Sequence, residues 1–367
     1  IHTYAQDGRL FEGKTPVSAF LNSSYDGSFI AGLMELRYIQ SLPVERIINY
    51  FESHGFTLKK PTAHKLMEKA SSLFENLYKC IRQTALSDPY KAADETYYKI
   101  LVPEKNSKGK GVRKGYLWVV VGINTRMIYL LYDDGSRSEK VILNELGGCK
   151  GIIQSDGYSP YRKLESDAYP HITRIPCLQH IKRKFIDCGE DEPDAKRIVE
   201  LINTLYQNEH KHKIGVDGWT VEQNLVHRKK YAPDILGEIK DVLDDIEERG
   251  DLLPKSELKE AITYLRNEWN AVVDIFNYGD TYLDNNIVER MNRYISLSRK
   301  NSLFFGSHKG AERGAILYTI ALTCRMHKVN LFEYLTDVIN RTAEWQPNTP
   351  IEKYRELLPD RWEKAND

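Results

Sequence analysis

The sequence contains no apolar run that approaches the roughly 20 residues needed to cross a bilayer, and its 367 residues show no signal peptide. We therefore expect a protein with no membrane partner. A surplus of one charge is also missing, because 52 lysines and arginines balance 52 aspartates and glutamates. This balance argues against a general nucleic-acid coat protein, so any binding to nucleic acid must come from local basic patches.

Cysteine is scarce and scattered. The five cysteines form no CxxC pair and stand at Cys80, Cys149, Cys177, Cys188 and Cys324. Their odd number and spacing exclude a disulfide framework and a zinc ribbon, and they suit the reducing conditions of a cytoplasm. The chain opens with Ile1 rather than methionine, from which we expect that something upstream was removed.

A chain of 367 residues is too long for one small core, which predicts two or three domains. Residues 1–25 show no clear period and are interpreted as an arm, and the Pro-rich end is more typical of a tail than of a core. The predicted segments are an N-terminal arm and helical DNA-binding region at 1–88, the first part of an α/β domain at 89–190, an all-helical insertion at 191–280, the last part of the α/β domain at 281–345 and a C-terminal tail at 346–367. We expect the helices of the insertion to pack on one another.

Two helices joined by a glycine turn are predicted early in the chain. Pro43 suits the start of the first helix, Gly55 suits its end, and Pro61 lies in the first turn of the second. This pattern resembles a helix-turn-helix, and the basic side chains that it would offer to DNA are Lys59, Lys60 and Lys65. A plain helical hairpin with a solvated basic face is the alternative.

The pattern changes to strands near residue 90. Stretches rich in β-branched and aromatic residues at 93–101, 115–124 and 126–135 predict three consecutive, hairpin-linked strands. A short helix, a strand that ends at Asp156, a helix, a strand near 171–177 and another helix follow. This is the element order of an RNase H-like, retroviral-integrase-like α/β domain, here with an all-helical insertion and a preceding helix-turn-helix-like domain.

Three acids occupy the places where such a domain carries its catalytic carboxylates. Asp94 lies in the first strand, Asp156 ends the fourth, and Glu289 lies on a later helix. Each acid also has a structural interpretation. Asp94 could sit at a bulge with Glu95 as the active neighbour, Asp156 could serve only a turn made with Gly157, and Glu289 could pair with an arginine one helical turn further on.

The residue types fit phosphodiester chemistry. Mg²⁺ prefers hard oxygen ligands, and two such ions can activate an attacking oxygen and stabilise a leaving one. Three crowded carboxylates would otherwise repel one another, and a bound cation removes that conflict.

Basic side chains gather in two further stretches that could contact DNA. The first follows Glu289 and contains Arg290, Arg293, Arg299 and Lys300, and the second is an acid-free hairpin containing Lys108, Lys110, Arg113 and Lys114. Asn285, Glu289 and Arg293 share one face of the predicted helix, so a carboxylate and an arginine could be aimed together at a phosphate. A solvated loop is the alternative for the hairpin.

At this point the motifs resemble the DDE transposases of the insertion-sequence sixty-six family. The resemblance is carried by "ADETYYKIL", "IIQSDGYSPYRKL", "CLQHIKRKF" and "DNNIVERMNRYISLSRKNSLFFGSHKGAERGAILYTI". It implies cutting and joining of DNA with Mg²⁺, or Mn²⁺ as a substitute, at Asp94, Asp156 and Glu289.

The resemblance also implies the partners. These are double-stranded DNA with terminal inverted repeats and a target, a homodimer or larger synaptic complex, accessory proteins, and a prokaryotic cytoplasm in which the bound protein lies on the nucleoid. The family's cysteine-rich zinc segment is missing upstream, and we expect no zinc in this chain.

Cys177 and His180 match the family's CxxH. Two ligands are too few for zinc, so a packing or site-shaping role is favoured, as it is for Asn285. Trp269 could stack on an extruded base, but its place on the apolar face of a predicted helix favours a core tryptophan.

Two rivals to a transposase remain. One is a nuclease of the same fold that cannot join strands, and the other is a domesticated, non-catalytic DNA-binding protein. The presence of all three acids disfavours the second, because a pure binder does not need mutually repelling carboxylates.

Overall fold

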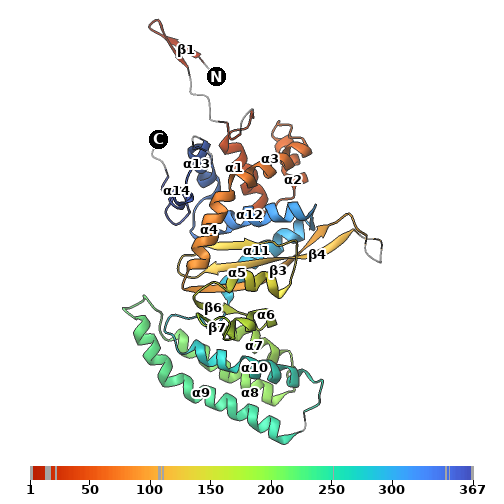
Figure 1. Cartoon of the computed structure of the whole chain (residues 1–367), viewed down its shortest axis with the longest axis vertical. Coiled ribbons are helices and arrows are strands. Elements are labelled where there is room, and N and C mark those ends of the chain that lie inside the picture. Colours follow the sequence, from red (N-terminus) through yellow and green to blue (C-terminus); the bar gives the residue numbers. More distant parts are fainter. Residues whose placement is uncertain are drawn as a thin grey trace. The chain divides into compact units, whose positions relative to one another are not determined.

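The computed structural model describes residues 3–12, 18–20, 23–105, 109, 111–250, 252–343, 345–346 and 348–364 (Figure 1). Lys108 and Lys110, both predicted to contact DNA, lie outside the described residues. The chain forms two compact units. The first unit comprises Ile1–Asp88, Glu95–Arg137 and Arg290–Asp367, and the second comprises Pro89–Asp94 and Ser138–Glu289. None of the described helices is both long and apolar enough to span a bilayer.

A small hairpin opens the first unit, where the sequence had predicted an arm without regular structure. Strands β1 (Thr3–Gln6) and β2 (Arg9–Glu12) pair antiparallel, and Asp7 and Gly8 between them have φ angles of 50° and 74°. An Asp-Gly pair is a strong signal for the two-residue turn that needs positive φ at both positions. The Asp-Gly pair therefore indicates this hairpin in the sequence, although the hairpin was not predicted.

Helices make up most of the first unit. Its helical elements are α1 (Gly27–Met34), the π-helix η1 (Glu35–Ile39), α2 (Val44–Ser53), α3 (Lys60–Leu73), α4 (Glu75–Ser87), α12 (His308–Met326), α13 (Leu331–Ala343), α14 (Ile351–Arg355) and most of α11 (Asn286–Asn301). The predicted pair of helices around Gly55 is present as α2 and α3. Helix α12 is buried along most of its length and lies beside strand β5 (Ile128–Leu131), as an apolar helix in the middle of a core should (Figure 1).

The strands of the first unit follow the predicted order. They are β3 (Tyr90–Leu101), β4 (Val112–Gly122), β5 and the two-residue β8 (Phe304–Phe305), and β3 runs on from the second unit. The hydrogen-bonding order is β5-β4-β3, with β4 and β5 antiparallel and β8 parallel to β3. Strand β8 was not predicted, because two residues are too few to show an alternating pattern.

The C-terminal segment was predicted to be a tail, and the structure shows that this is wrong for Leu357 and Leu358, which are buried. The indole N–H of Trp362 donates to Asp337 Oδ2 at 2.6 Å, and the hydroxyl of Tyr334 donates to the carbonyl of Leu357 at 2.8 Å. The short helix α14 in this segment packs on α4. It was not predicted because its few apolar residues are separated by polar residues and prolines.

The second unit contains three parallel strands at one edge of the larger sheet, together with several helices. Its strands are the first residues of β3, β6 (Gly151–Ser155) and β7 (Ile172–Pro176), in the order β3-β6-β7. Its helices are α5 (Glu139–Leu146), α6 (Ser159–Arg162), the 3₁₀ helix η2 (Lys163–Glu165), α7 (Leu178–Ile186), α8 (Pro193–His210), α9 (Val221–Arg249) and α10 (Glu257–Ile275). The predicted mixed α/β architecture is confirmed.

The helices predicted as an insertion at 191–280 do not pack only on one another, which corrects that expectation. Helix α10 lies against α7 and β7 (Figure 1). Arg174 on β7 and Glu268 on α10 form a fully buried ion pair, and Arg174 also binds Glu165. The boundaries proposed at 190 and 280 do not coincide with those of the compact units, because β6, β7 and these helices share one core.

Candidate active site

The register of two parallel strands brings the first two predicted acids together. Tyr90 and Ala92 on β3 pair with Ile152 and Gln154 on β6, an offset of 62 residues. Continuing this register by two residues places Asp94 level with Asp156. Adjacent strands lie about 4.8 Å apart, and alternate residues share a face. The hydroxyl of Tyr90 donates to Gln154 Oε1 at 2.6 Å, which shows that this set of side chains shares one face.

Glu95, the neighbouring alternative to Asp94, is occupied elsewhere. The guanidinium of Arg137 donates to its Oε1, with Nε at 2.9 Å, and only 5% of the Glu95 side chain is exposed. Successive strand residues point to opposite faces. Asp94 is therefore the residue of this pair that shares a face with Gln154 and Asp156.

Asp156 both caps a turn and keeps a free oxygen. The N–H of Tyr158 donates to Asp156 Oδ1 at 3.1 Å, which ends the strand in a side-chain turn. Among the described residues, the other carboxylate oxygen, Oδ2, has no hydrogen-bond donor. The turn interpretation and the ligand interpretation of Asp156 are thus compatible.

Gly157 was expected to turn the chain, but its φ is not positive. The constraint is steric. Its N–H donates to the hydroxyl of Tyr264 at 2.8 Å, and a Cβ at this position would lie 2.5–2.8 Å from the Tyr264 ring and hydroxyl. Tyr264 lies on α10, so this close approach fastens the end of β6 to the helical part of the unit. Burial, followed by the charge of Asp156, raises the pKa of Tyr264.

We predict that Gly157→Ala lowers the free energy of unfolding by about 1–3 kcal/mol, because overpacking forces Tyr264 or the strand end to shift. Gly148→Ala is the matched control, since a Cβ there meets nothing within 4 Å. Urea denaturation of both variants, and of Gly157→Ala combined with Tyr264→Leu, measures the effect. Equal losses in the two single variants, or no recovery in the double variant, would contradict the steric explanation.

The segment before α11 is fastened to the same strand ends. The N–H of Tyr282 donates to the hydroxyl of Tyr90 at 3.0 Å, and its carbonyl accepts from Gln154 Nε2 at 2.8 Å. The side-chain amide of Asn285 donates to the carbonyl of Ala93 at 2.9 Å. These bonds hold the first turn of α11, which carries Glu289, beside the first residues of β3 and the end of β6. Asn285 is 1% exposed, and it is a positioning residue of the site.

Glu289 presents an unpaired oxygen. Its side chain is 21% exposed, while Oε1 itself is buried and has no hydrogen bond among the described residues. His180 Nδ1, which lies 3.8 Å from Glu289 Oε1, and Asn285 Oδ1 are also buried and also have no hydrogen bond among the described residues. Buried polar atoms are nearly always satisfied, so these three atoms are candidate ligands for a cation or a polar group.

Cys177 completes this cluster. It is 1% exposed, the N–H of Asn285 donates to its Sγ at 3.2 Å, and burial raises the pKa of its thiol to about 12. One ligand atom from each of Cys177, His180 and Glu289 lies within 4.8 Å of the others. The sequence argument against zinc considered only Cys177 and His180 as ligands. The structure adds Glu289 as a third candidate ligand, which lies more than 100 residues further along the chain.

Asp94, Asp156 and Glu289 all belong to the second unit and are all half-buried. Their carboxylate oxygens are of the kind that Mg²⁺ prefers. Among the described residues, however, the group whose ligand atoms all lie within 4.8 Å of one another joins Glu289 to Cys177 and His180, and includes neither Asp94 nor Asp156.

Trp269 has two predicted roles. It is half-buried on α10, whereas the adjacent Glu268 is 1% exposed and faces Arg174. Trp269 is thus only partly buried, and both its role as a core tryptophan and its stacking on a base stay predictions. The buried face of α10 that contains Leu258 and Leu265 continues to Glu268. A pattern of apolar residues alone would predict that a charged residue such as Glu268 is exposed.

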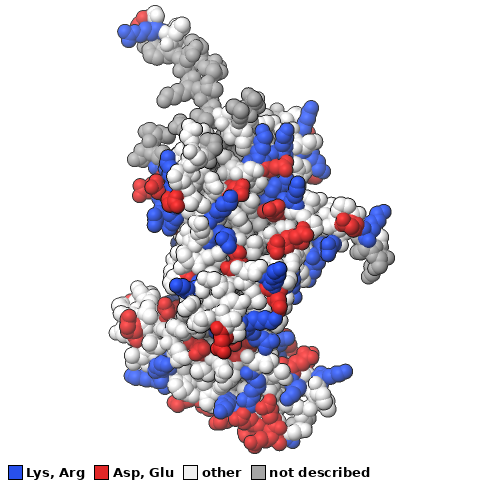
Figure 2. All heavy atoms as spheres, viewed as in Figure 1, with Lys and Arg blue, Asp and Glu red and all other residues white. Residues whose placement is uncertain are grey.

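The predicted DNA-contacting residues that are described belong to the first unit. Lys59, Lys60 and Lys65 are exposed around the start of α3, where Lys60 pairs with Glu45. Figure 2 shows basic side chains gathered over α2 and α3. This surface, named below the α3 basic face, consists of Lys59, Lys60, Lys65 and Lys69.

A second group surrounds an aromatic ring. The guanidinium of Arg299 lies 4.0 Å and the ammonium of Lys114 lies 4.3 Å from the centroid of Tyr97. Both cations were predicted from the sequence, but Tyr97 was not. Arg113, Arg290, Arg293 and Lys300 are exposed.

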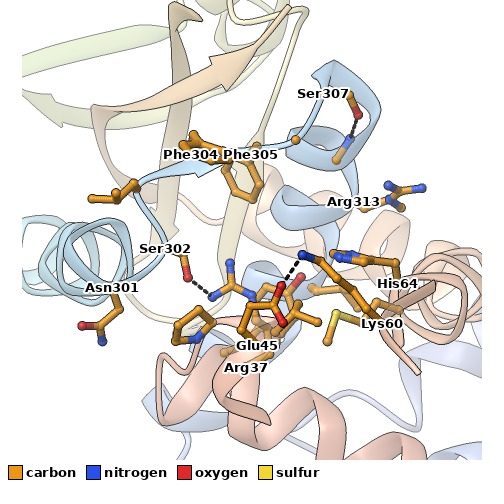
Figure 3. A pocket seen from close by; sticks show the side chains of 18 residues that line it. Arg37, Glu45, Lys60, His64, Asn301, Ser302, Phe304, Phe305, Ser307 and Arg313 are labelled. Carbon is orange, nitrogen blue, oxygen red and sulfur yellow. Dashed lines mark hydrogen bonds and ion pairs between the residues drawn. The ribbon is translucent and has the colours of Figure 1, made fainter. Parts of the chain in front are cut away.

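The first unit also contains a cavity of about 450 Å³ that the sequence did not reveal (Figure 3). Its lining includes Arg37, Lys60, His64, Phe304, Phe305 and Arg313. Arg37 is buried and donates to the hydroxyls of Ser302 at 3.0 Å and Ser298 at 3.3 Å, which fixes the segment that leads to Phe304. Part of this lining comes from the stretch "RKNSLFFGSHKG", in which aromatic, basic and small residues alternate without a helical or strand period.

Comparison with known proteins places the chain among transposase-like sequences. The family described as "Transposase IS66 family" matches residues 22–313. Two uncharacterized proteins of Sinorhizobium fredii are similar over most of the chain. One, y4jD, is 26% identical over 346 residues, covering 90% of this chain and 65% of y4jD. The other, y4hP, is 25% identical over 347 residues, covering 88% of this chain and 60% of y4hP. The chain thus spans less than two thirds of either relative.

Proposed function

Because this chain belongs to the IS66 family of transposases, we propose that it is a metal-dependent DNA transposase that cleaves the ends of an insertion sequence and joins them to a target. Asp94, Asp156 and Glu289 are the proposed catalytic acids. The observation that supports the proposal is the parallel register of β3 and β6, which pairs Ala92 with Gln154, two residues before each acid. The amide of Asn285 and the N–H of Tyr282 attach the segment before α11 to β3.

The strand order supports an RNase H-like catalytic domain. The first unit contributes β5-β4-β3 and the second contributes β3-β6-β7, so that β3 belongs to both. In this arrangement the first and fourth strands of the domain, β3 and β6, are parallel neighbours. Asp94, within β3, and Asp156, directly after β6, would then lie on neighbouring strands.

The residues have distinct roles in the proposed reaction. Asp94, Asp156 and Glu289 would hold Mg²⁺ or Mn²⁺, which supplies positive charge at the reacting phosphate. Tyr90 and Gln154 hold the backbone of Tyr282, so they position Glu289 without touching the phosphate. The turn made by Asp156 Oδ1 keeps that carboxylate at the strand end.

A nuclease that cleaves without joining is the second candidate, and the same acids would serve it. A labelled terminal inverted repeat incubated with a target plasmid and Mg²⁺ distinguishes the two. A transposase yields cleaved ends and joined products, whereas a nuclease yields cleaved ends alone. Binding without either product would support the non-catalytic alternative and contradict our proposal.

We further propose that the α3 basic face and the cations around Tyr97 contact DNA. Exposed cations around an aromatic ring can bind a phosphate backbone and stack on a base. The partners that follow from the family are two DNA ends, a dimer or larger synaptic complex, and accessory proteins in a prokaryotic cytoplasm.

Replacing Lys59, Lys60 and Lys65 with alanine is expected to weaken DNA binding and to reduce the slope of log K against log salt by about 2–3, because each lost phosphate contact releases one counterion fewer. Lys196, Lys230 and Lys240 are the matched control, since they are exposed lysines on α8 and α9. Fluorescence anisotropy in a salt titration measures both triple variants. Identical slopes for the two variants would remove the α3 basic face from the DNA interface.

A further inference from the structure

We propose that Cys177, His180 and Glu289 form a second cation site, which takes a thiophilic divalent metal such as Zn²⁺ and draws Glu289 away from Asp94 and Asp156. The binding claim stands on the side-chain cluster alone. The inhibitory consequence rests on the proposed function.

Local structure explains why the three donors meet. Cys177 is the residue before the first turn of α7 and His180 lies in that turn, so their three-residue spacing turns both toward α11. Glu289 lies in the first turn of α11, whose approach is fixed by the N–H of Leu178 donating to the carbonyl of Leu283 at 2.8 Å. The N–H of Asn285 on Cys177 Sγ is the kind of bond that orients a metal-binding sulfur.

The donor atoms fit zinc better than magnesium. Zinc binds sulfur at about 2.3 Å and nitrogen or oxygen at about 2.0–2.2 Å, so its tetrahedral ligands stand about 3.3–3.8 Å apart. The donors here lie within 4.8 Å of one another, with His180 Nδ1 and Glu289 Oε1 at 3.8 Å. Modest rotation of the half-exposed His180 and Glu289 side chains closes the remaining gap. Mg²⁺ has no preference for a thiol or an imidazole.

The unpaired atoms are the second, independent indication of a ligand. His180 Nδ1 and Glu289 Oε1 are both buried, both lack hydrogen bonds among the described residues, and face each other. A cation between them would satisfy both atoms at once. Its binding would transfer the thiol proton of Cys177 to solvent and leave a thiolate as the third ligand. Water or a further donor would complete the four positions.

One carboxylate then belongs to two sets of ligands of different hardness. With oxygen donors, Glu289 completes the Asp94 and Asp156 set. With sulfur and nitrogen donors, it completes the Cys177 and His180 set. A thiophilic metal at low concentration would therefore reduce Mg²⁺-dependent DNA cleavage without competing for Asp94 or Asp156.

Binding is tested with Co²⁺ and Zn²⁺ on the full chain. The Co²⁺ complex should show a thiolate-to-cobalt charge-transfer band, which Zn²⁺ should displace with one equivalent. Cys177→Ser should abolish the band, and Cys177→Ser, His180→Asn and Glu289→Gln should each weaken Zn²⁺ binding about 100-fold in calorimetric titration, because each removes a ligand. Thermal melting without metal checks that each variant folds. If Cys177→Ser does not fold, His180→Asn tests the site instead, because the His180 side chain is partly exposed and its replacement should disturb the fold less.

The controls separate this site from the proposed catalytic one. Cys188→Ser, at a half-exposed cysteine elsewhere, should keep the band and the affinity, as should Asp94→Asn and Asp156→Asn. A band that survives Cys177→Ser, or Zn²⁺ affinity that is lost in Asp94→Asn and kept in His180→Asn, would overturn the proposed site.

The functional arm compares cleavage with and without Zn²⁺ at a fixed excess of Mg²⁺. Wild-type protein and Cys188→Ser should be inhibited, and the ratio of the two rates should return toward one in His180→Asn. Equal inhibition of His180→Asn would overturn the link between the cluster and activity. If the wild-type chain does not cleave DNA at all, the proposed function fails, while the Co²⁺ and Zn²⁺ titrations still decide the metal site.

Discussion

Asp94→Asn, Asp156→Asn and Glu289→Gln are each expected to abolish DNA cleavage, with a loss of at least about 1,000-fold. Each change keeps the size of the side chain but removes the negative charge of a proposed cation ligand. DNA binding should persist, because the proposed contacts lie on other elements. Folding should be unchanged or slightly firmer, since like charges no longer crowd one another. Cleavage of a labelled terminal repeat, beside a gel-shift assay, measures both properties.

Glu95→Gln is the internal control. It weakens the ion pair between Arg137 and the Glu95 side chain, which is 5% exposed, so stability should fall by about 1–3 kcal/mol while activity remains. An inactive Glu95→Gln beside an active Asp94→Asn would show that the face assignment of β3 is wrong by one residue. If all three ligand variants still cleave DNA, the proposed catalytic acids are falsified.

Arg228→Met is expected to lower the free energy of unfolding of the second unit by about 3–5 kcal/mol, because it breaks a buried, fully bonded charge pair. The Arg228 side chain is 1% exposed on α9 and binds both oxygens of Glu209 at 2.8 Å and 2.6 Å. It also donates to the carbonyls of Ile275, Tyr278 and Thr281 at 3.2 Å, 2.6 Å and 2.6 Å. Without it the carbonyls of Tyr278 and Thr281 lose this donor, whereas that of Ile275 keeps the hydroxyl of Thr281.

The same arginine should affect activity. The carbonyls that it binds belong to the segment that leads into Tyr282 and α11, so loosening them should displace Glu289 and reduce cleavage even at temperatures where the protein stays folded. Lys229→Met is the matched control. Its side chain is exposed and its ammonium donates to Asn277 Oδ1 at 2.7 Å, so stability should change by less than about 0.5 kcal/mol. Urea denaturation that gives similar midpoints for both variants would contradict this role of Arg228.

The three acids were predicted from their chemistry and their order along the chain, and their catalytic role stays a prediction. A strand that ends in an acid, as at Asp156, is visible as a change from isoleucine to aspartate and glycine. The offset of 62 residues between Asp94 and Asp156, computed first from sequence, is also the pairing offset of β3 and β6. The strands themselves were legible because valine, isoleucine and aromatic residues fill them.

The rest of the site depends on contacts between distant segments. The approach of His180 to Glu289 joins residues more than 100 positions apart, and no periodicity encodes it. The burial of Glu268 was hidden because a charged residue is read as exposed until its partner, Arg174, is known. The same limit explains why the helices at 191–280 looked self-contained. Their contacts with β7 are made by side chains that look solvated in a one-dimensional pattern.

The segment that delivers Glu289 is held through main-chain groups on its own side. Tyr282 contributes its N–H and carbonyl, and Leu283 contributes its carbonyl, while the partners use the side chains of Tyr90 and Gln154. Every residue except proline offers these main-chain groups. Replacing Tyr282 or Leu283 with any residue except proline therefore leaves these main-chain bonds available. At these two positions the place of the third acid depends on the backbone, whereas at Asn285 it depends on the side-chain amide that binds Ala93.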